Sequence, residues 1–270
     1  MKQYPVILSI AGSDCSGGAG IQADIKAISA LGGYAASAIT AVTVQNTLGV
    51  QAVQGVSPVI VCGQIEAVMS DLHPAAVKIG MVTNTETVHV IATCLQKYQP
   101  HHVVYDPVMI STSGRKLMID ETIESIKEEL LPRVSLLTPN LDEARVLTGK
   151  DIRHLKEMKE AAYSLVDTYH IPMLIKGGHL EGDRMCDLLC TTDAVFHLFE
   201  EKKIDSSNLH GTGCTLSSAI ATWLAKGATL EESVRRAKAY VTLTIKEGKD
   251  LHIGHGNGPL WHFPESLAQM

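Results

Sequence analysis

Short apolar runs alternate with longer amphipathic stretches along most of this chain. The runs have the length of buried strands, and the stretches between them repeat apolar residues at helical spacing. This alternation is typical of parallel β–α–β units, in which helices cover a buried sheet. The predicted strands are Val6–Ala11, Tyr34–Val44, Val50–Val56, Ala75–Ile79, Val103–Tyr105, Ser135–Leu137 and Met173–Ile175.

The predicted helices fill the intervals between these strands. Met185–Ile204 instead has short β-branched and apolar runs, which predict two antiparallel strands. No linker, repeat or low-complexity tract interrupts the pattern, so we expect one α/β domain over residues 1–270. The predicted helices start near Ile21 and end at Leu31, span Val59–Leu72, Glu86–Lys97, Glu121–Leu131 and Lys156–Tyr169, and begin again near Gly211 and Thr229.

Composition narrows the functional classes. Apolar residues make up 45% of the 270 residues but aromatic ones only 4%, so the core must be aliphatic. The net charge of −6 argues against a broad nucleic-acid-binding or membrane-binding surface. We find neither a signal-peptide core nor a membrane span. The six cysteines are scattered, which favours reduced thiols in a cytoplasmic protein.

The sharpest local motif is His210–Thr215, a glycine-rich turn followed by the apolar helix Leu216–Lys226. Glycines allow a tight turn, and a helix start offers free N–H groups and a positive dipole end, which together suit a phosphate. The motif lacks the Gly-Lys-Ser/Thr of a Walker A loop and the third glycine of a dinucleotide fingerprint. The alternative is a turn that merely starts a buried helix.

Polar residues follow three successive predicted strands. Asp106 ends one, Asn140 and Glu143 follow the next, and Lys176 with two glycines and His179 follows the third. Ligands of open α/β sheets bind at the carboxyl ends of the strands, where carboxylates hold magnesium and lysine holds phosphate. Gln45 ends another strand, and its amide suits the edge of an aminopyrimidine. Taken singly, each residue also fits a solvated loop or turn.

These residues together resemble the hydroxymethylpyrimidine and phosphomethylpyrimidine kinases of thiamine biosynthesis, relatives of pyridoxal kinases in the ribokinase-like superfamily. The resemblance spans nearly the whole chain in family order. It implies a three-layer αβα sandwich with a mainly parallel sheet. The matching segments are Gly12–Asp24, Val44–Thr47, Lys78–Met81, Asp106–Met109, Thr138–Glu143, Lys176–His179, His210–Thr215 and Gly254–Pro259.

The resemblance also implies a role for each matching residue. Gln45 binds the pyrimidine edge, and Asp106 and Glu143 lie at Mg²⁺. Cys214 stands where sugar kinases carry an aspartate base, and we expect the helix start to shift it toward thiolate. The other expected residues are Gly12, Ala19, Asp24, Met81 and Val108 around the substrate, Lys176, Asn140, Thr212 and Lys238 at ATP, and Gly211, Thr212 and Gly213 in the anion hole.

The implied reaction is ATP- and magnesium-dependent phosphorylation of 4-amino-5-hydroxymethyl-2-methylpyrimidine and of its monophosphate. A monovalent cation stays open as a further requirement. The first alternative is a pyridoxine, pyridoxal or pyridoxamine kinase, and Gln45 favours the pyrimidine. The second is a protein that keeps the fold and binds ligand without catalysis. The resemblance further implies a homodimer, with the predicted hairpin Tyr34–Val56 as candidate interface or lid.

Overall fold

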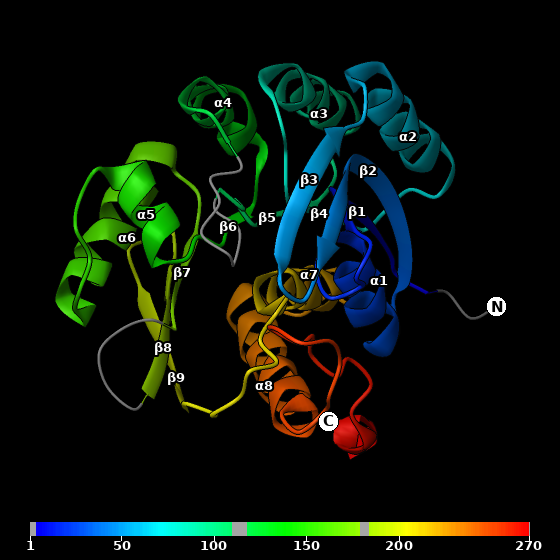
Figure 1. The fold of residues 1–270 in the computed structure, drawn as a ribbon. Helices are drawn as coiled ribbons and strands as arrows, with labels where there is room; N and C mark the ends of the chain where they lie inside the picture. Colours follow the sequence, from blue (N-terminus) through cyan, green and yellow to red (C-terminus); the bar gives the residue numbers. More distant parts are fainter. Residues whose placement is uncertain (1–3, 110–117, 179–183, 270) are drawn as a thin grey trace.

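Nine strands form one sheet in the computed structural model, which describes residues 4–109, 118–178 and 184–269 (Figure 1). The strand order is β3-β2-β1-β4-β5-β6-β7-β8-β9. The pairs β2–β3, β7–β8 and β8–β9 are antiparallel, and the other pairs are parallel. The strands are β1 Val6–Asp14, β2 Tyr34–Asn46, β3 Gly49–Gly55, β4 Ala76–Ile79, β5 His102–Tyr105, β6 Leu136–Leu137, β7 Met173–Gly177, β8 Arg184–Cys190 and β9 Phe196–Lys202.

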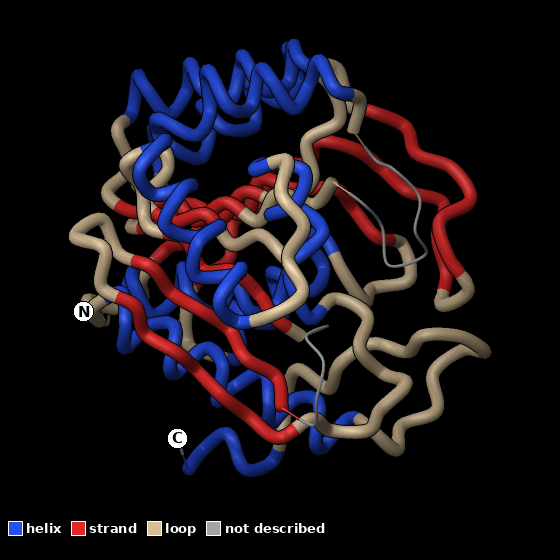
Figure 2. Tube along the Cα trace, turned by 90° about the vertical axis from the view of Figure 1, so that its left-hand side faces the viewer, coloured by secondary structure: helices blue, strands red, loops and turns tan. Residues whose placement is uncertain are grey.

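Helices cover both faces of the sheet (Figures 1 and 2). One apolar core lies between the sheet and α1, α7 and α8, and the other lies against α2 to α6. The expected three-layer αβα sandwich is therefore confirmed. The helices are α1 Gly20–Ala30, α2 Pro58–Asp71, α3 Thr85–Tyr98, α4 Asp120–Ser125 with a π turn at Ile126–Leu130 and a 3-10 turn at Leu131–Arg133, α5 Leu141–Thr148, α6 Leu155–Tyr169, α7 Thr212–Ala225, α8 Leu230–Gly248 and a 3-10 turn at Glu265–Gln269.

Strand alternation decides which side chains face α7. Successive residues of a strand point to opposite faces. In β4, Val77 and Ile79 join the core under α2 and α3, so Lys78 points to the face of α1 and α7. In β7, Leu174 joins the core under α7 and α8, so Lys176 points to the same face two residues later. Two lysines are thereby directed toward α7 from an apolar sheet.

Most predicted elements are present, including the two antiparallel strands within Met185–Ile204. One prediction was wrong and one helix was missed. Strand β1 does not end at Ala11 but continues to Asp14, pairing with β2 across an irregularity in register. Residues Leu141–Thr148, for which we predicted no element, form α5. None of the helices in the described part of the chain is both long and apolar enough to cross a membrane.

Candidate functional site

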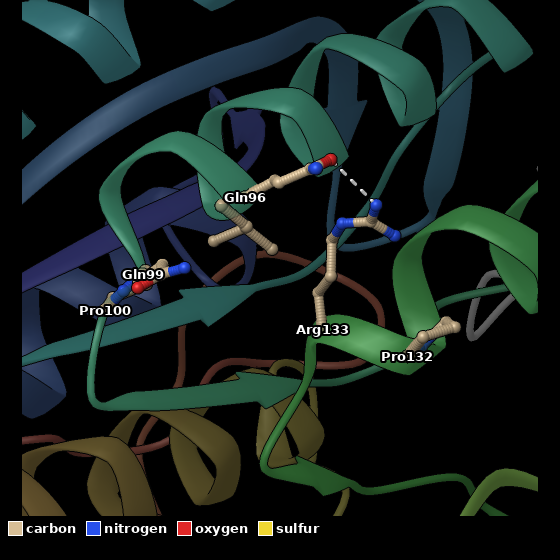
Figure 3. Close-up of a pocket in the computed structure, with 6 residues that line it drawn as sticks. Gln96, Gln99, Pro100, Pro132 and Arg133 are labelled. Carbon is tan, nitrogen blue, oxygen red and sulfur yellow. Dashed lines mark hydrogen bonds between the residues drawn. The ribbon is translucent and has the colours of Figure 1, made fainter.

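The polar strand ends predicted from the sequence meet at one edge of the sheet, on the side of α7. Asp14 ends β1, Gln45 lies one residue before the end of β2, Asp106 follows β5, and Lys176 lies in β7. A separate surface hollow, shown in Figure 3, lies beside the C-terminal end of α3 and is lined in part by Gln96 and Arg133. Because α3 ends just before β5 begins, this hollow lies at the opposite sheet edge, away from these residues.

Glycines let backbone segments touch at the start of α7. Gly211 caps the helix with φ 85°, a left-handed conformation that L side chains rarely adopt. A Cβ atom at Gly211 would lie 1.9 Å from the carbonyl oxygen of Gly18. Both the hydroxyl and the N–H of Thr212 donate to the carbonyl of Leu209, at 2.7 and 3.3 Å, so Thr212 closes the turn into α7. The first turn of α7 thus packs directly on the loop after β1.

A mostly buried ion pair lies against this helix start. Lys176 Nζ donates to Asp106 Oδ1 at 2.5 Å, and the hydroxyl of Thr138 donates to the same oxygen at 3.1 Å. A Cβ at Gly213 would lie 3.2 Å from Asp106 Oδ2 and 3.3 Å from Lys176 Nζ. Burial lowers the pKa of Lys176, but Asp106 and Glu143 outweigh burial and raise it, so the ammonium is charged. The arrangement suits a phosphate between Lys176 and the start of α7.

Asn140 and Glu143 form a capping box at the start of α5. The Asn140 side chain accepts the N–H of Glu143 at 2.9 Å, and Glu143 Oε2 accepts the N–H of Asn140 at 2.8 Å. Burial raises the pKa of Glu143 to about 7, against the lowering effect of Lys176 and with a further rise from Asp106. Both residues thus support the helix, and Glu143 lies within electrostatic reach of the ion pair.

The carboxylates near Lys176 suit a magnesium ion that is bound mainly by substrate phosphates. They do not form a site in which protein side chains alone hold the metal. In residues 4–109, 118–178 and 184–269, no three His, Cys, Asp or Glu side chains gather to hold a metal ion. Magnesium typically takes one or two carboxylates, several waters and substrate phosphates. Asp106 keeps Oδ2 clear of Lys176 and Thr138, and Glu143 is the second carboxylate nearby. Asp106 and Glu143 therefore fit an ion that is bound mainly by nucleotide.

Gln45 contacts His210, which in turn contacts Asp14, and the sequence analysis gave neither of these two residues a role. Nε2 of Gln45 lies 3.1 Å from Nε2 of His210, and the same His210 nitrogen lies 2.9 Å from Oδ2 of Asp14. Asp14 is nearly buried, as is His210. The available signal was an acid at the very end of the first strand, together with a histidine just before the glycine-rich turn.

Three further predicted substrate residues lie around the same loop. A Cβ at Gly12 would lie 2.4 Å from Cε of Met81, so these two residues touch. The N–H of Ala19 donates to Asp14 Oδ2 at 2.9 Å. Val108 is half-buried, and its N–H donates to the carbonyl of Asp106 at 2.9 Å. Gly12 thus touches Met81, Ala19 contacts Asp14, and Val108 lies beside the ion pair.

Asp24 was wrongly expected to line the pocket. It is fully buried, and its carboxylate accepts hydrogen bonds from Lys78 at 2.8 and 2.9 Å, Ser9 at 2.6 Å and Ser218 at 2.7 Å. These four bonds occupy both oxygens. Asp24 instead ties α1, β1, β4 and α7 together beneath the site.

The expected thiolate at Cys214 is also wrong. Burial raises the pKa of Cys214 to about 11, although Lys78 lowers it in part. Cys214 is therefore a neutral thiol at neutral pH, because the loss of hydration outweighs the lowering effects of Lys78 and of the N–H of Gly20.

Lys238 does not offer its ammonium to a nucleotide. Its Nζ donates to Asp187 Oδ2 at 2.6 Å, and the other Asp187 oxygen accepts the N–H of Gly177 at 2.9 Å. The pair is almost fully buried between α8 and β8. We correct the expected direct ATP contact to a structural role, in which Lys238 fixes the end of β7 behind Lys176. His179, quoted with the Lys176 motif, lies outside the described residues.

An open, mainly parallel sheet with a glycine-capped helix start beside a lysine–aspartate pair suits an enzyme that binds phosphate. The fold is that of the ribokinase-like class, which the resemblance implied. Comparison with known proteins narrows this class. The phosphomethylpyrimidine kinase family matches residues 14–261. The chain belongs to this family.

Individual relatives agree with the family match. The chain is 49% identical over 259 residues to the hydroxymethylpyrimidine/phosphomethylpyrimidine kinase of Rhizobium meliloti, covering 96% of this chain and 97% of that protein. The crystal structure of phosphomethylpyrimidine kinase from Clostridium difficile has 43% identity and a TM-score of 0.79, covering 88% and 98% of the two chains. Pyridoxal kinase from Staphylococcus aureus, in complex with AMP-PCP and pyridoxal, has 30% identity and a TM-score of 0.89, covering 98% and 96%.

Proposed function

We propose that this protein transfers the γ-phosphoryl group of ATP to the hydroxymethyl group of 4-amino-5-hydroxymethyl-2-methylpyrimidine, and then to the resulting monophosphate, in thiamine biosynthesis. The observation that carries the proposal is the contact of Gly213 with the Asp106–Lys176 pair, at the sheet edge that also holds Gln45. The family membership supports this substrate class.

Each group then has a defined task. Lys176 and the N–H groups of the first turn of α7 bind the transferring phosphoryl group and neutralise its charge. Asp106 and Glu143 would hold Mg²⁺, which would offset the negative charge of the nucleotide phosphates. The alcohol oxygen forms the new bond to the γ-phosphorus while the bond to the ADP oxygen breaks.

Cys214 orients the acceptor alcohol instead of ionising first. Its neutral thiol offers a weak donor and a weak acceptor. Phosphoryl transfer passes through a loose transition state, so little base strength is needed before the new bond forms. The alcohol proton then leaves late, after the oxygen has gained a bond to phosphorus, and passes to an oxygen of the transferred phosphoryl group.

The test is ADP release by the purified protein with this pyrimidine, its monophosphate and pyridoxal as acceptors. We expect turnover with both pyrimidines and a lower kcat/KM with pyridoxal. Lys176→Met should abolish most turnover, because the charge that meets the phosphate is gone. A higher kcat/KM for pyridoxal would instead identify a vitamin B6 kinase, and binding by calorimetry without turnover would identify a non-catalytic protein. Repeating the assay with K⁺ or Na⁺ tests the monovalent cation.

We also propose a cytoplasmic homodimer. All six cysteines are free thiols, which suits a reducing compartment. The hairpin of β2 and β3 and the start of α2 expose large apolar side chains, which a second copy of the chain would cover. Sedimentation should give a dimer, and Val44→Glu should weaken it; a monomeric wild type would contradict the proposal. The exposed residues are Val42, Val44, Leu48, Val59 and Ile60.

A further inference from the structure

Three side chains from distant segments meet at the end of the site that holds Gln45. Asp14 ends β1, Gln45 is near the end of β2, and His210 directly precedes the turn into α7. Nε2 of His210 lies 2.9 Å from Asp14 Oδ2 and 3.1 Å from the Gln45 amide nitrogen Nε2. Nε2 of His210 thus lies within hydrogen-bond distance of both Asp14 and Gln45. Whether this nitrogen carries a proton decides whether each neighbour must accept or donate a hydrogen bond.

Asp14 requires that this nitrogen carry the proton. Its carboxylate also accepts the N–H groups of Ser16, Gly18 and Ala19 and the hydroxyl of Ser16. Burial alone would raise the pKa of Asp14, but the hydrogen bonds from His210 and Ser16 outweigh it and hold the pKa well below its usual range. An ionised carboxylate only accepts hydrogen bonds, so Nε2 of His210 is a donor.

The other end of the Gln45 amide is constrained by Thr43. Its hydroxyl lies 3.0 Å from the carbonyl of Ser13 and 3.2 Å from Gln45 Oε1. A hydroxyl has one proton, and a backbone carbonyl can only accept it. If that proton goes to Ser13, the hydroxyl oxygen facing Gln45 has only lone pairs to offer. Thr43 therefore favours an N–H from Gln45 at this end.

The contacts at both ends of the Gln45 amide favour the same orientation of that amide. His210 presents a donor where Gln45 Nε2 lies, and Thr43 presents an acceptor where Oε1 lies. Turning the amide by 180° exchanges these two atoms without moving the rest of the side chain. Oε1 then shares the single Nε2–H of His210 with Asp14 in a three-centre hydrogen bond, and the amide Nε2 donates to Thr43. One lone pair and one N–H of the amide remain for a ligand.

We propose that His210 is a positioning residue that fixes the orientation of the Gln45 amide and thereby selects an amidine edge, such as the ring nitrogen and amino group of an aminopyrimidine. The proposal deepens the proposed function and rests on it. A pyridine ring without the adjacent amino group cannot pair with both remaining amide atoms. Loss of the His210 donor frees the amide to turn, so discrimination between the two rings falls.

The kinetic test compares His210→Gln, which keeps an N–H donor near the place of Nε2, with His210→Leu, which has none. We expect His210→Leu to raise KM for the aminopyrimidine about tenfold, the worth of one lost hydrogen bond, while KM for ATP is unchanged. His210→Gln should recover most of this loss. Equal losses in the two variants would overturn the proposal.

A double-mutant cycle separates positioning from general damage. In the Gln45→Ala background, His210→Leu should change kcat/KM for the aminopyrimidine less than about twofold, because no amide is left to orient. An unchanged tenfold loss in that background would overturn the proposal. Melting temperatures of all four proteins check that each variant folds.

A spectroscopic measurement keeps this proposal distinct from the proposed function. In ¹⁵N-histidine-labelled wild type, the signal that disappears in His210→Gln should be that of a ring protonated at Nε2. A ring without a proton on Nε2 would overturn the positioning role even if the enzyme phosphorylates the pyrimidine. Absence of any pyrimidine turnover by wild type would refute the proposed function, whichever nitrogen carries the proton.

Discussion

The buried pair of Lys78 and Asp24 gives a quantitative test of how the site is supported. Both side chains are completely shielded from water, and Lys78 Nζ lies 2.8 and 2.9 Å from the two carboxylate oxygens. Lys78→Met removes the ammonium but leaves the carboxylate buried, with only the hydroxyls of Ser9 and Ser218. Breaking such a pair on one side costs about 3–5 kcal/mol, because a buried charge loses its partner.

The sign of the pH dependence follows from the lysine. Burial lowers the pKa of Lys78, but Asp24 outweighs burial and raises the pKa above its ordinary range. A raised folded-state pKa adds stability that is fully present below the pKa of the unfolded chain. The effect of Lys78→Met is therefore fully present at neutral pH, where urea unfolding is practical. For a chain near this length, the melting temperature should fall by about 6–20 °C.

Two further variants make this prediction refutable. Lys97→Met removes an exposed ion pair with Glu66 and should change stability little. Adding Asp24→Asn to Lys78→Met removes the stranded charge and should restore part of the loss. The reasoning fails if Lys78→Met costs less than about 1 kcal/mol, a value below the range for buried pairs. It also fails if the double variant is no more stable than the single one.

Three other perturbations probe the site directly. Gly213→Ala places a methyl group against Asp106 and Lys176, so kcat should fall about 100-fold with little change in melting temperature; an unchanged kcat would show that the helix start does not face the phosphate. Burial raises the pKa of Glu143 from 4.5 to about 7, so the free energy of unfolding of wild type relative to Glu143→Gln should fall as pH rises from 4.5 to 7 and then level off. Urea unfolding across this range checks the sign, and a rise would contradict it. Burial raises the pKa of Cys214 to about 11, so iodoacetamide at pH 7.5 should alkylate Cys214 more slowly than the exposed Cys15. Peptide mass spectrometry measures both rates, and faster labelling of Cys214 would indicate a thiolate.

Much of the sheet was predictable because each strand carries its own signal. Val6 onward, Ala75–Ile79 and Met173–Ile175 are apolar runs between helical periods, and their carboxyl ends meet as parallel topology requires. The contact between the start of α7 and Lys176 follows from the same rule. These features are local patterns joined by a general rule of α/β folds.

Partners that are distant in sequence were not predictable in this way. Asp24 belongs to the same glycine-rich segment as the substrate loop, and only the folded chain shows that it turns inward to Lys78, 54 residues away. A lysine inside an apolar strand was the available signal for a buried acid. The neutral state of Cys214 likewise depends on burial, which no local pattern shows.

The short helix α5 was missed for a different reason. Its eight residues span about two turns, and the polar residues at its start were interpreted only as ligands. Asn140 and Glu143 also form a capping box, the usual mark of a helix start. Asn140 and Glu143 thus indicate both a helix start and a ligand site. The sequence analysis used them only to predict the ligand site.

The contact of Gly211 with the carbonyl of Gly18 has a consequence for how this fold acquires new substrates. At this contact the base of the site consists of main-chain atoms, so a side chain at Gly211 would clash with the carbonyl of Gly18. Substrate rings of different shape must therefore be accommodated by substitutions at the residues that line the site with side chains, such as Gln45 and Met81. A mutational library of the gene should lose nearly every change at Gly211, while variants at these lining positions survive with altered vitamin preference.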